Sequence, residues 1–232
     1  MTRRGEMPQW WLADSFVAEH LAPQLGPNGP GFAHFGKVVD DDYLALVNAE
    51  IDSQVQWRDN HTVHRNKRGA LIHQNYDAHV LKLAIGSQEK VIRLPLVRSL
   101  VHSVENLVRY TMATDFPTLV DWRADEMALH RYDPNAVGID PHRDQTRFWG
   151  IIALMTLKGE GQFLVQGYEP SITLQPGNLV LMRGAGLYPS KDEIRPMHSV
   201  ATHDTDGRTS LVIRADRQYN EQFDGFVYDN WP

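Results

Sequence analysis

Apolar residues recur at helical spacing in two segments of the N-terminal half. Residues 40–42 are three aspartates that can supply an N-cap and first-turn carboxylates, and the helix after them carries Leu44, Val47 and Ile51 on one face. Pro95 suits the first position of a second helix. The apolar stripe after Pro95 consists of Val97, Leu100, Val101, Val104, Leu107, Val108 and Met112. This second helix should therefore pack its stripe against a broad apolar surface.

After Phe116 the pattern changes to short runs that are typical of β-strands. Turn signals rich in Pro, Gly, Asn and Asp separate these runs, and no helical stripe lies between them. We expect strands at residues 127–132, 137–140, 148–157, 162–166, 171–174, 178–183, 197–201 and 208–215. This order favours a mainly β (α+β) fold in which N-terminal helices cover one outer face of a double-sheet jelly roll. Residues 22–32, rich in Pro and Gly, predict a loop.

The composition narrows the domain organisation and the chemistry. We expect one domain over residues 1–232, with helical support and a substrate lid in 1–116, the β core in 117–216 and a C-terminal tail in 217–232. The chain has no Cys, so any metal must be bound by His and carboxylate. No apolar run approaches the roughly 18 residues of a membrane span, and we expect a cytoplasmic protein without a membrane partner.

The charge distribution bears on the kind of partner. A net charge of −6 argues against a globally basic nucleic-acid binder. Residues 58–68, RDNHTVHRNKR, nevertheless form a local basic patch. The ordinary interpretation is a solvated loop, and the alternative is a lid or clamp for an anionic substrate.

The segment IDPHRDQ, residues 139–145, places His142 and Asp144 two positions apart, so on an extended chain both side chains point to one face. Chance alone can supply such a pair, and a metal site needs a third, distant ligand. His198, on the expected strand 197–201, is the best placed, with His203 in the turn-like HDTDG as the alternative. Two imidazoles and one carboxylate on one face of a metal suit non-haem Fe(II) and dioxygen chemistry.

The last expected strand carries two arginines on one face. Arg208, Ser210, Val212 and Arg214 follow at steps of two and therefore point the same way. If this face is buried, an anion must meet the arginines, and a dicarboxylate suits them because guanidinium groups bind carboxylates bidentately. The hydroxyl of Ser210 can add a donor. The alternative is an exposed edge strand with solvated arginines.

These motifs together resemble a known family. The segments HRYDPNAVGIDPHRD (130–144) and RTSLVIR (208–214), with His198 between them, are similar to the Fe(II)- and 2-oxoglutarate-dependent dioxygenases, most closely their AlkB-like branch. The resemblance covers roughly residues 127–216. It implies a double-stranded β-helix core of the jelly-roll or cupin-like type.

The resemblance also implies roles for individual residues. His142, Asp144 and His198 would bind Fe(II), and 2-oxoglutarate would be the cosubstrate. Its two carboxylate ends would bind Arg208 and Arg214, and the remaining residues expected to contact it are Tyr132, His130 and Ser210. His130 and Ser210 stand where the family has Asn, but both can still form hydrogen bonds.

The activity implied is hydroxylation of a C–H bond in a small-molecule substrate, with consumption of O2 and release of succinate and CO2. The carboxylate of Asp144 favours hydroxylation over halogenation, for which the family replaces it with a small residue. One alternative is AlkB-like oxidative demethylation of alkylated nucleic acid, and another is a jelly-roll module that binds a ligand without turnover. The residues expected to contact the substrate are Arg65, Arg68, His73, Tyr76 and Trp149.

Overall fold

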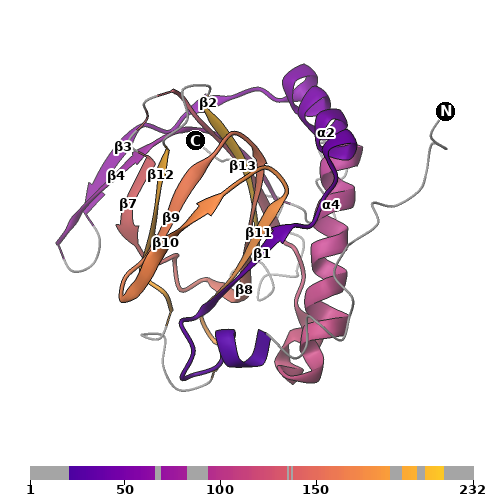
Figure 1. Cartoon of the computed structure of the whole chain (residues 1–232), viewed down its shortest axis with the longest axis vertical. Helices are drawn as coiled ribbons and strands as arrows, with labels where there is room; N and C mark the ends of the chain where they lie inside the picture. Colours follow the sequence, from indigo (N-terminus) through magenta and orange to yellow (C-terminus); the bar gives the residue numbers. More distant parts are fainter. Residues whose placement is uncertain are drawn as a thin grey trace.

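Two antiparallel sheets face each other in the computed structural model, which describes residues 21–65, 69–82, 94–134, 136, 138–188, 195–202 and 207–216 (Figure 1). The larger sheet has, in spatial order, β1 (Phe32–Lys37), β11 (Asn178–Arg183), β8 (Phe148–Lys158), β13 (Arg208–Asp216), β6 (Glu126–Tyr132), β5 (Asp77–Lys82) and β2 (Arg58–Asp59). The smaller sheet has β10 (Tyr168–Leu174), β9 (Gly161–Val165), β12 (His198–Thr202), β7 (Gly138–His142), β4 (Leu71–Asn75) and β3 (Thr62–Arg65).

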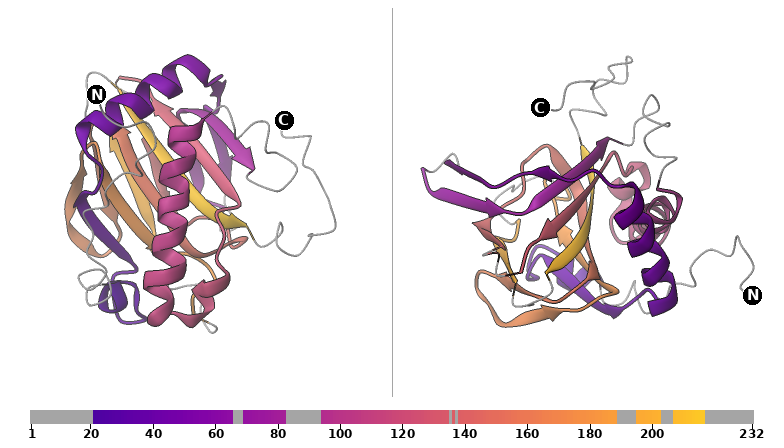
Figure 2. Two further views of the ribbon diagram at one scale, coloured as in Figure 1. Left: turned by 90° about the vertical axis from the view of Figure 1, so that its right-hand side faces the viewer. Right: turned by 90° about the horizontal axis from the view of Figure 1, so that it is seen from above.

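Helices cover the outer face of the larger sheet, as Figure 2 shows. They are α2 (Asp41–Gln54), α4 (Pro95–Asn106), the π-helical turn η1 (Leu107–Thr111) and the 3-10 turns η2 (Met112–Thr114) and η3 (Pro117–Asp121). The Asp40 carboxylate accepts the backbone N–H of Tyr43 at 2.7 Å and caps α2. Glu50 of α2 accepts the backbone N–H groups of Leu96 and Val97 at 3.0 Å each, so α2 also caps α4.

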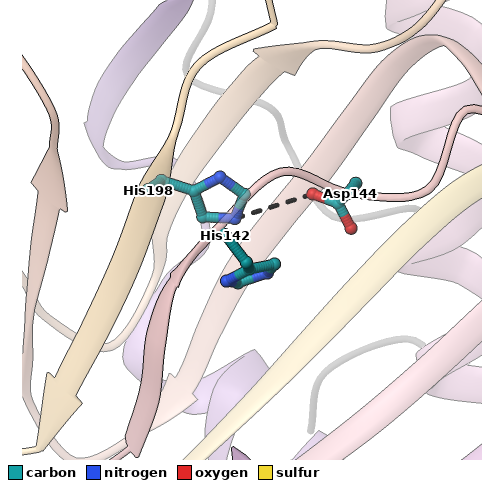
Figure 3. A group of neighbouring side chains, drawn as sticks. All are labelled: His142, Asp144 and His198. Carbon is teal, nitrogen blue, oxygen red and sulfur yellow. Dashed lines mark ion pairs between the residues drawn. The ribbon is translucent and has the colours of Figure 1, made fainter. Parts of the chain in front are cut away.

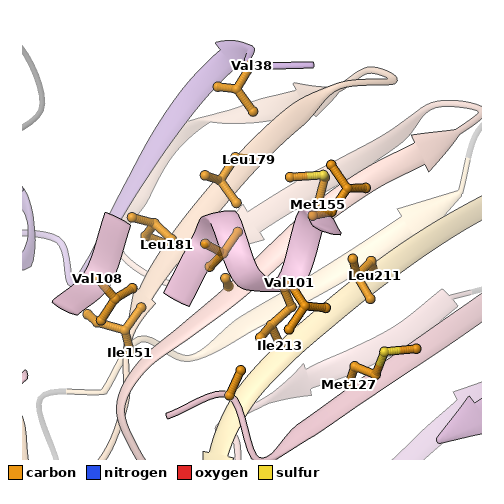
Figure 4. Close-up of a cluster of buried hydrophobic side chains, with 14 of the residues drawn as sticks. Val38, Val101, Val108, Met127, Ile151, Met155, Leu179, Leu181, Leu211 and Ile213 are labelled. Carbon is orange, nitrogen blue, oxygen red and sulfur yellow. The ribbon is translucent and has the colours of Figure 1, made fainter. Parts of the chain in front are cut away.

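The centre of the larger sheet is buried on both faces. On its outer face Met127, Ile151 and Leu211 belong to one apolar cluster with the helix residue Val101 (Figure 4). A second apolar cluster fills the space between the two sheets and is made of Phe32, Ala128, Phe148, Ile152, Leu154, Phe163, Val165, Leu174, Val180, Met182, Val200 and Val212. The central strands β8 and β11 therefore read as nearly continuous apolar runs.

The structure confirms the eight expected strands, with bounds that differ by up to three residues, and the two expected helices. The second α-helix ends at Asn106, and the rest of its apolar stripe lies in the π-helical turn 107–111 and the 3-10 turn that begins at Met112. The double-sheet jelly roll with helices on one face is likewise confirmed. The arginine face of β13 points between the sheets rather than to solvent, since Arg208 and Ser210 are almost fully buried.

Two expectations for the N-terminal half are wrong. Residues 22–32 are not a single loop, because residues 21–25 are helical and Phe32 opens β1. The basic patch of residues 58–68 is not simply a loop either, because it contains β2 and β3. Residues 66–68, with the candidate Arg68, lie outside the described residues, as do His203 and the tail 217–232. Within the described ranges, no helix is both long and apolar enough to span a membrane.

Candidate metal centre and anion site

Two histidines that are far apart in the sequence are direct neighbours across the smaller sheet. His142, the last residue of β7, pairs in register with His198, the first residue of antiparallel β12, and their ring centroids lie 4.4 Å apart. Gly138 makes this close pairing feasible: its φ is 86°, and a Cβ there would lie 1.9 Å from the carbonyl oxygen of Val200. The glycine therefore lets β7 approach β12 closely enough to bring the two rings together.

Asp144 completes a three-residue group at the same edge of the sheet (Figure 3). It lies in the loop after β7, and its Oδ2 is 3.6 Å from Nε2 of His198. The candidate ligand atoms of His142, Asp144 and His198 all lie within 4.8 Å of one another. This is the 2-His-1-carboxylate set that suits Fe(II).

Backbone carbonyls fix the orientation of both imidazoles. Nδ1 of His142 donates to the carbonyl of Asp140 at 2.8 Å, and Nδ1 of His198 donates to the carbonyl of Pro196 at 3.3 Å. A carbonyl can only accept, so Nδ1 carries the proton and Nε2 keeps its lone pair for a metal. The residues present therefore fit an Fe(II) ion.

The electrostatic environment favours the protonation states that bind a metal. Burial, together with the neighbouring His142, lowers the pKa of His198 to about 4. Burial by itself would raise the pKa of Asp144, but the neighbouring Arg214, followed by His198, His142 and Arg195, outweighs burial and lowers that pKa below its usual value. At neutral pH the group thus contains a neutral His198 and an ionised Asp144.

Arg214 lies beside Asp144 but forms its closest ion pair elsewhere. Its Nη1 donates to Oε1 of Glu126 at 2.8 Å, whereas its Nη2 is 3.5 Å from Oδ1 of Asp144. Burial lowers the pKa of Arg214, but the carboxylates of Asp144 and Glu126 raise it above its usual value. This guanidinium is therefore matched by two carboxylates of the chain itself.

Arg208, at the other end of the inward face of β13, has no such match. Its side chain is almost fully buried, and its Nη2 donates to the Thr156 hydroxyl at 3.1 Å. Nε and Nη1 of Arg208 and the buried hydroxyl of Ser210 have no hydrogen-bond partner in the part of the chain that the structure describes. A buried cation with free donors calls for an anionic ligand. The carboxylate of 2-oxoglutarate has the chemistry to meet them.

Aromatic rings lie between the two arginines. The Tyr132 ring centroid is 5.5 Å from Cζ of Arg208, and His130 stacks on Tyr76 with centroids 4.3 Å apart. Burial, followed by the charges of Arg214 and Arg208, lowers the pKa of His130 to about 3. His130 is therefore a neutral hydrogen-bonding group, as the Asn of the resembling family would be.

The residues expected to contact the substrate fall in three different places. Arg65 and His73 are exposed on β3 and β4, and Nδ1 of His73 lies at hydrogen-bond distance, 2.5 Å, from Oδ2 of Asp140. Tyr76 is buried beside His130 and Tyr132, not on the exposed hairpin. Trp149 packs against the apolar cluster under the helices, so the structure does not bring it to the metal group.

Sequence reasoning missed two residues of this arrangement, Glu126 and Thr156. Both are almost fully buried polar residues on the strands that flank β13. The available signal was a charged or hydroxyl side chain inside otherwise apolar strands, EMALHRY and FWGIIALMTLK. That signal identifies a buried polar group but not its partner, which depends on strand register.

A second group of possible metal ligands lies at the surface. Asp59, His61 and Asp77 also hold ligand atoms within 4.8 Å of one another, but Asp59 and His61 are exposed. Asp77 forms a 2.5 Å ion pair with Arg131. An exposed acidic group of this kind is common without a metal, and nothing further marks it as a site.

No family model and no curated protein matches the chain. Solved structures do match. A prolyl-4-hydroxylase of Pseudomonas putida is 16% identical, with 88% of this chain and 99% of that chain covered and a TM-score of 0.55. A Trichoplax adhaerens prolyl hydroxylase, in complex with a peptide fragment of the hypoxia inducible factor oxygen degradation domain, is 11% identical, with 92% and 94% covered and a TM-score of 0.57.

A full-length Neurospora crassa protein, in complex with alpha-KG, is 14% identical, with 88% of this chain and 81% of that chain covered and a TM-score of 0.57. At such identities the likeness shows the fold and not the activity. Membership of the AlkB-like branch stays a prediction. The chain therefore has the jelly-roll fold of these two prolyl hydroxylases and of the Neurospora crassa protein.

Proposed function

We propose that this chain is an Fe(II)- and 2-oxoglutarate-dependent dioxygenase. The observation that carries the proposal is the combination of two features inside one fold. A His-Asp-His group offers three metal ligands, and Arg208 offers buried guanidinium donors that no described residue accepts. Either feature alone is less specific, but the pair suits a metal ion and a carboxylate-bearing cosubstrate bound in one interior.

Each residue has a distinct part in this function. His142 and His198 would present neutral Nε2 atoms and Asp144 a charged oxygen to Fe(II), and the backbone carbonyls behind the imidazoles keep them in place. Arg208, with Ser210, would anchor the carboxylate of 2-oxoglutarate that lies far from the metal. When bound, the iron would supply oxidation of the substrate by O2, coupled to decarboxylation of 2-oxoglutarate to succinate and CO2.

For the substrate we propose a small molecule whose C–H bond is hydroxylated. The net charge of −6 disfavours a polyanionic partner, and the exposed Arg65 and His73 on β3 and β4 suit recognition of a small, polar or anionic compound. Because one structural neighbour was solved with a peptide fragment, short peptides belong in the substrate screen.

Demethylation of alkylated nucleic acid is the second candidate. It is favoured by the exposed Arg58 and Arg65 on β2 and β3. Binding to DNA or RNA oligonucleotides that weakens steeply as salt rises would support it, because phosphate contacts release counterions. No binding even at low salt would remove it.

The test of the main proposal is formation of succinate from 2-oxoglutarate with Fe(II), ascorbate and O2, across metabolites, peptides and methylated oligonucleotides. We expect substrate-stimulated succinate from the wild-type chain and none from His142→Ala or Asp144→Ala. His102→Ala, an exposed position on α4, is the matched control and should retain full turnover. Succinate formation that persists in Asp144→Ala would contradict the metal assignment. Absence of succinate across the whole panel would favour a jelly-roll module that binds without turnover.

A further inference from the structure

Glu126 is the residue that holds Arg214 in place. The two residues are direct cross-strand partners on β6 and β13, and their side chains form a 2.8 Å hydrogen-bonded ion pair. Glu126 is almost fully buried, with 2% of its side chain exposed. A carboxylate is expensive to bury unless it is paired, so Glu126 and Arg214 depend on each other at this inward position.

The surroundings of Glu126 make the pair rigid. Arg147 approaches the other oxygen of Glu126, with Nη2 3.9 Å from Oε2, and is itself bound to Asp216 at 3.0 Å. The ring of Phe148 contacts both arginines, and each Cζ lies 4.5 Å from its centroid. Arg214 is thus fixed by a carboxylate at one side of its guanidinium and by an aromatic ring against its plane.

The consequence of this restraint appears at the metal ligand. Arginine and a nearby carboxylate usually close to a hydrogen-bonded pair of about 2.7–2.9 Å. Here Nη2 of Arg214 stays 3.5 Å from Oδ1 of Asp144, beyond a good hydrogen bond, while the same guanidinium binds Glu126 at 2.8 Å. Arg214 therefore approaches only Oδ1 of Asp144 without closing on it, and Oδ2 faces the histidines, 3.6 Å from Nε2 of His198.

We propose that Glu126 is a positioning residue that keeps Arg214 from capturing Asp144, so that the carboxylate stays available to the metal. This inference rests on the proposed function, because it assumes that Asp144 is a metal ligand. Without Glu126, Arg214 would turn fully to Asp144 and compete with the metal for its oxygens. The binding of 2-oxoglutarate through Arg208, which lies at the opposite end of β13, would change much less.

The test is the affinity of the purified protein for Mn(II), measured by calorimetry without cosubstrate. We expect Glu126→Gln to weaken Mn(II) binding about 10-fold, the size typical of a lost partner behind a metal ligand. Glu50→Gln is the matched control, because Glu50 is another part-buried structural carboxylate, which caps α4 and lies away from the metal group. It should leave Mn(II) affinity unchanged even if it lowers the melting temperature.

A suppressor variant separates competition by Arg214 from general damage to the fold. In the double variant Glu126→Gln/Arg214→Gln the competing cation is gone, so Mn(II) affinity should return close to the wild-type value. Unchanged Mn(II) affinity in Glu126→Gln, or a double variant no better than the single one, would overturn the inference.

Should Glu126→Gln fail to fold, Glu126→Asp is the second variant. It keeps the charge with a shorter reach and should give an intermediate loss of Mn(II) affinity. Wild-type Mn(II) affinity in Glu126→Asp would count equally against the inference. A wild-type protein that binds no Mn(II) would instead overturn the proposed function itself.

Discussion

The two ends of β13 bury arginines on the same inward face but leave them in opposite states. Arg214 lies 2.8 Å from Glu126 and 3.5 Å from Asp144, so two carboxylates of the chain match its charge. Among the described residues Arg208 meets neutral groups, the Thr156 hydroxyl and the Tyr132 side chain, and two of its nitrogens lack a hydrogen-bond partner, against one, Nε, in Arg214. The pKa values shift accordingly: that of Arg214 is raised, whereas burial lowers that of Arg208.

This difference separates a structural charge from a ligand-binding one. A buried ion pair is weak evidence of function, because its partners satisfy each other. A buried arginine without a carboxylate partner destabilises the ligand-free protein, and it becomes favourable only when an external anion arrives. Arg208 is therefore the more informative of the two for function, although both occupy equivalent positions in the motif.

The largest effect is expected from replacing Arg208, the buried cation without a carboxylate partner. Arg208→Met should raise the dissociation constant of 2-oxoglutarate about 100-fold, since loss of a buried charged contact costs on the order of 3 kcal/mol. Calorimetric titration of the Mn(II)-loaded protein with 2-oxoglutarate measures it. Arg65→Met, at an exposed arginine of β3, is the control and should bind normally. Equal cosubstrate affinity in Arg208→Met and the wild type would remove Arg208 from the site.

Replacing each of the two arginines should change the free energy of unfolding differently. Arg214→Met leaves Glu126 buried without its closest partner, and we expect the free energy of unfolding to fall by about 2 kcal/mol, less than for a fully buried pair because Arg214 is partly exposed. Arg208→Met, which removes a cation that lacks a countercharge, should leave the ligand-free protein as stable as before or more so. Urea denaturation without metal or cosubstrate measures both. A larger loss of stability for Arg208→Met than for Arg214→Met would contradict the view that Arg214 is the structural charge and Arg208 the ligand-binding one.

The imidazole of His130, between the two arginines, should make the stability of the protein depend on pH. The pKa of His130 is about 3 in the folded protein, below the value near 6.5 of a free imidazole, so the unfolded chain binds the proton more readily. Above about pH 6.5 His130 does not affect the free energy of unfolding. As the pH falls below that value, protonation of the unfolded chain lowers this free energy progressively, and the loss is complete below about pH 3. His130→Asn should flatten the decline of the melting temperature between pH 6.5 and 4. A decline as steep as that of the wild type would show that His130 does not cause it.

The smallest effect is expected from the outer face of the same sheet. Trp149 packs under the helices, on the side away from the arginines, so Trp149→Phe should cost some packing energy and change 2-oxoglutarate affinity less than about 2-fold. Phe148 is one residue earlier and lies on the inward side. Phe148→Leu removes the ring that contacts Arg147 and Arg214 and should change 2-oxoglutarate affinity more than Trp149→Phe does. Calorimetry on both variants measures the contrast. A larger loss in Trp149→Phe would place Trp149 in the cosubstrate site after all.

Local periodicity was sufficient to predict the helices and the central strands. In α2 the residues Leu44, Val47 and Ile51 are all buried, as their spacing predicts, and β11 begins and ends at the residues expected. By contrast, β3 has the sequence TVHR and is exposed at all four positions. A strand without a buried face leaves no apolar alternation to detect, and its pairing with β4 is visible only in three dimensions.

The candidate site was predictable where it is local and not where it depends on register. His142 and Asp144 are two residues apart, and the motif itself indicates a shared face. The pairing of His198 with His142 and of Arg214 with Glu126 depends on which strands adjoin and in what register. Sequence spacing therefore treats Arg208 and Arg214 alike, and only the cross-strand carboxylate distinguishes them.

A crystal structure of the chain with Mn(II) and 2-oxoglutarate would show whether the His-Asp-His group binds the metal and Arg208 binds the cosubstrate. We predict anomalous density for Mn(II) between His142, Asp144 and His198, with one carboxylate of the cosubstrate against Nε and Nη1 of Arg208, and Arg214 still bound to Glu126. Mn(II) bound elsewhere, for example at the exposed group around Asp59, or a cosubstrate that leaves Arg208 without a partner, would contradict the account.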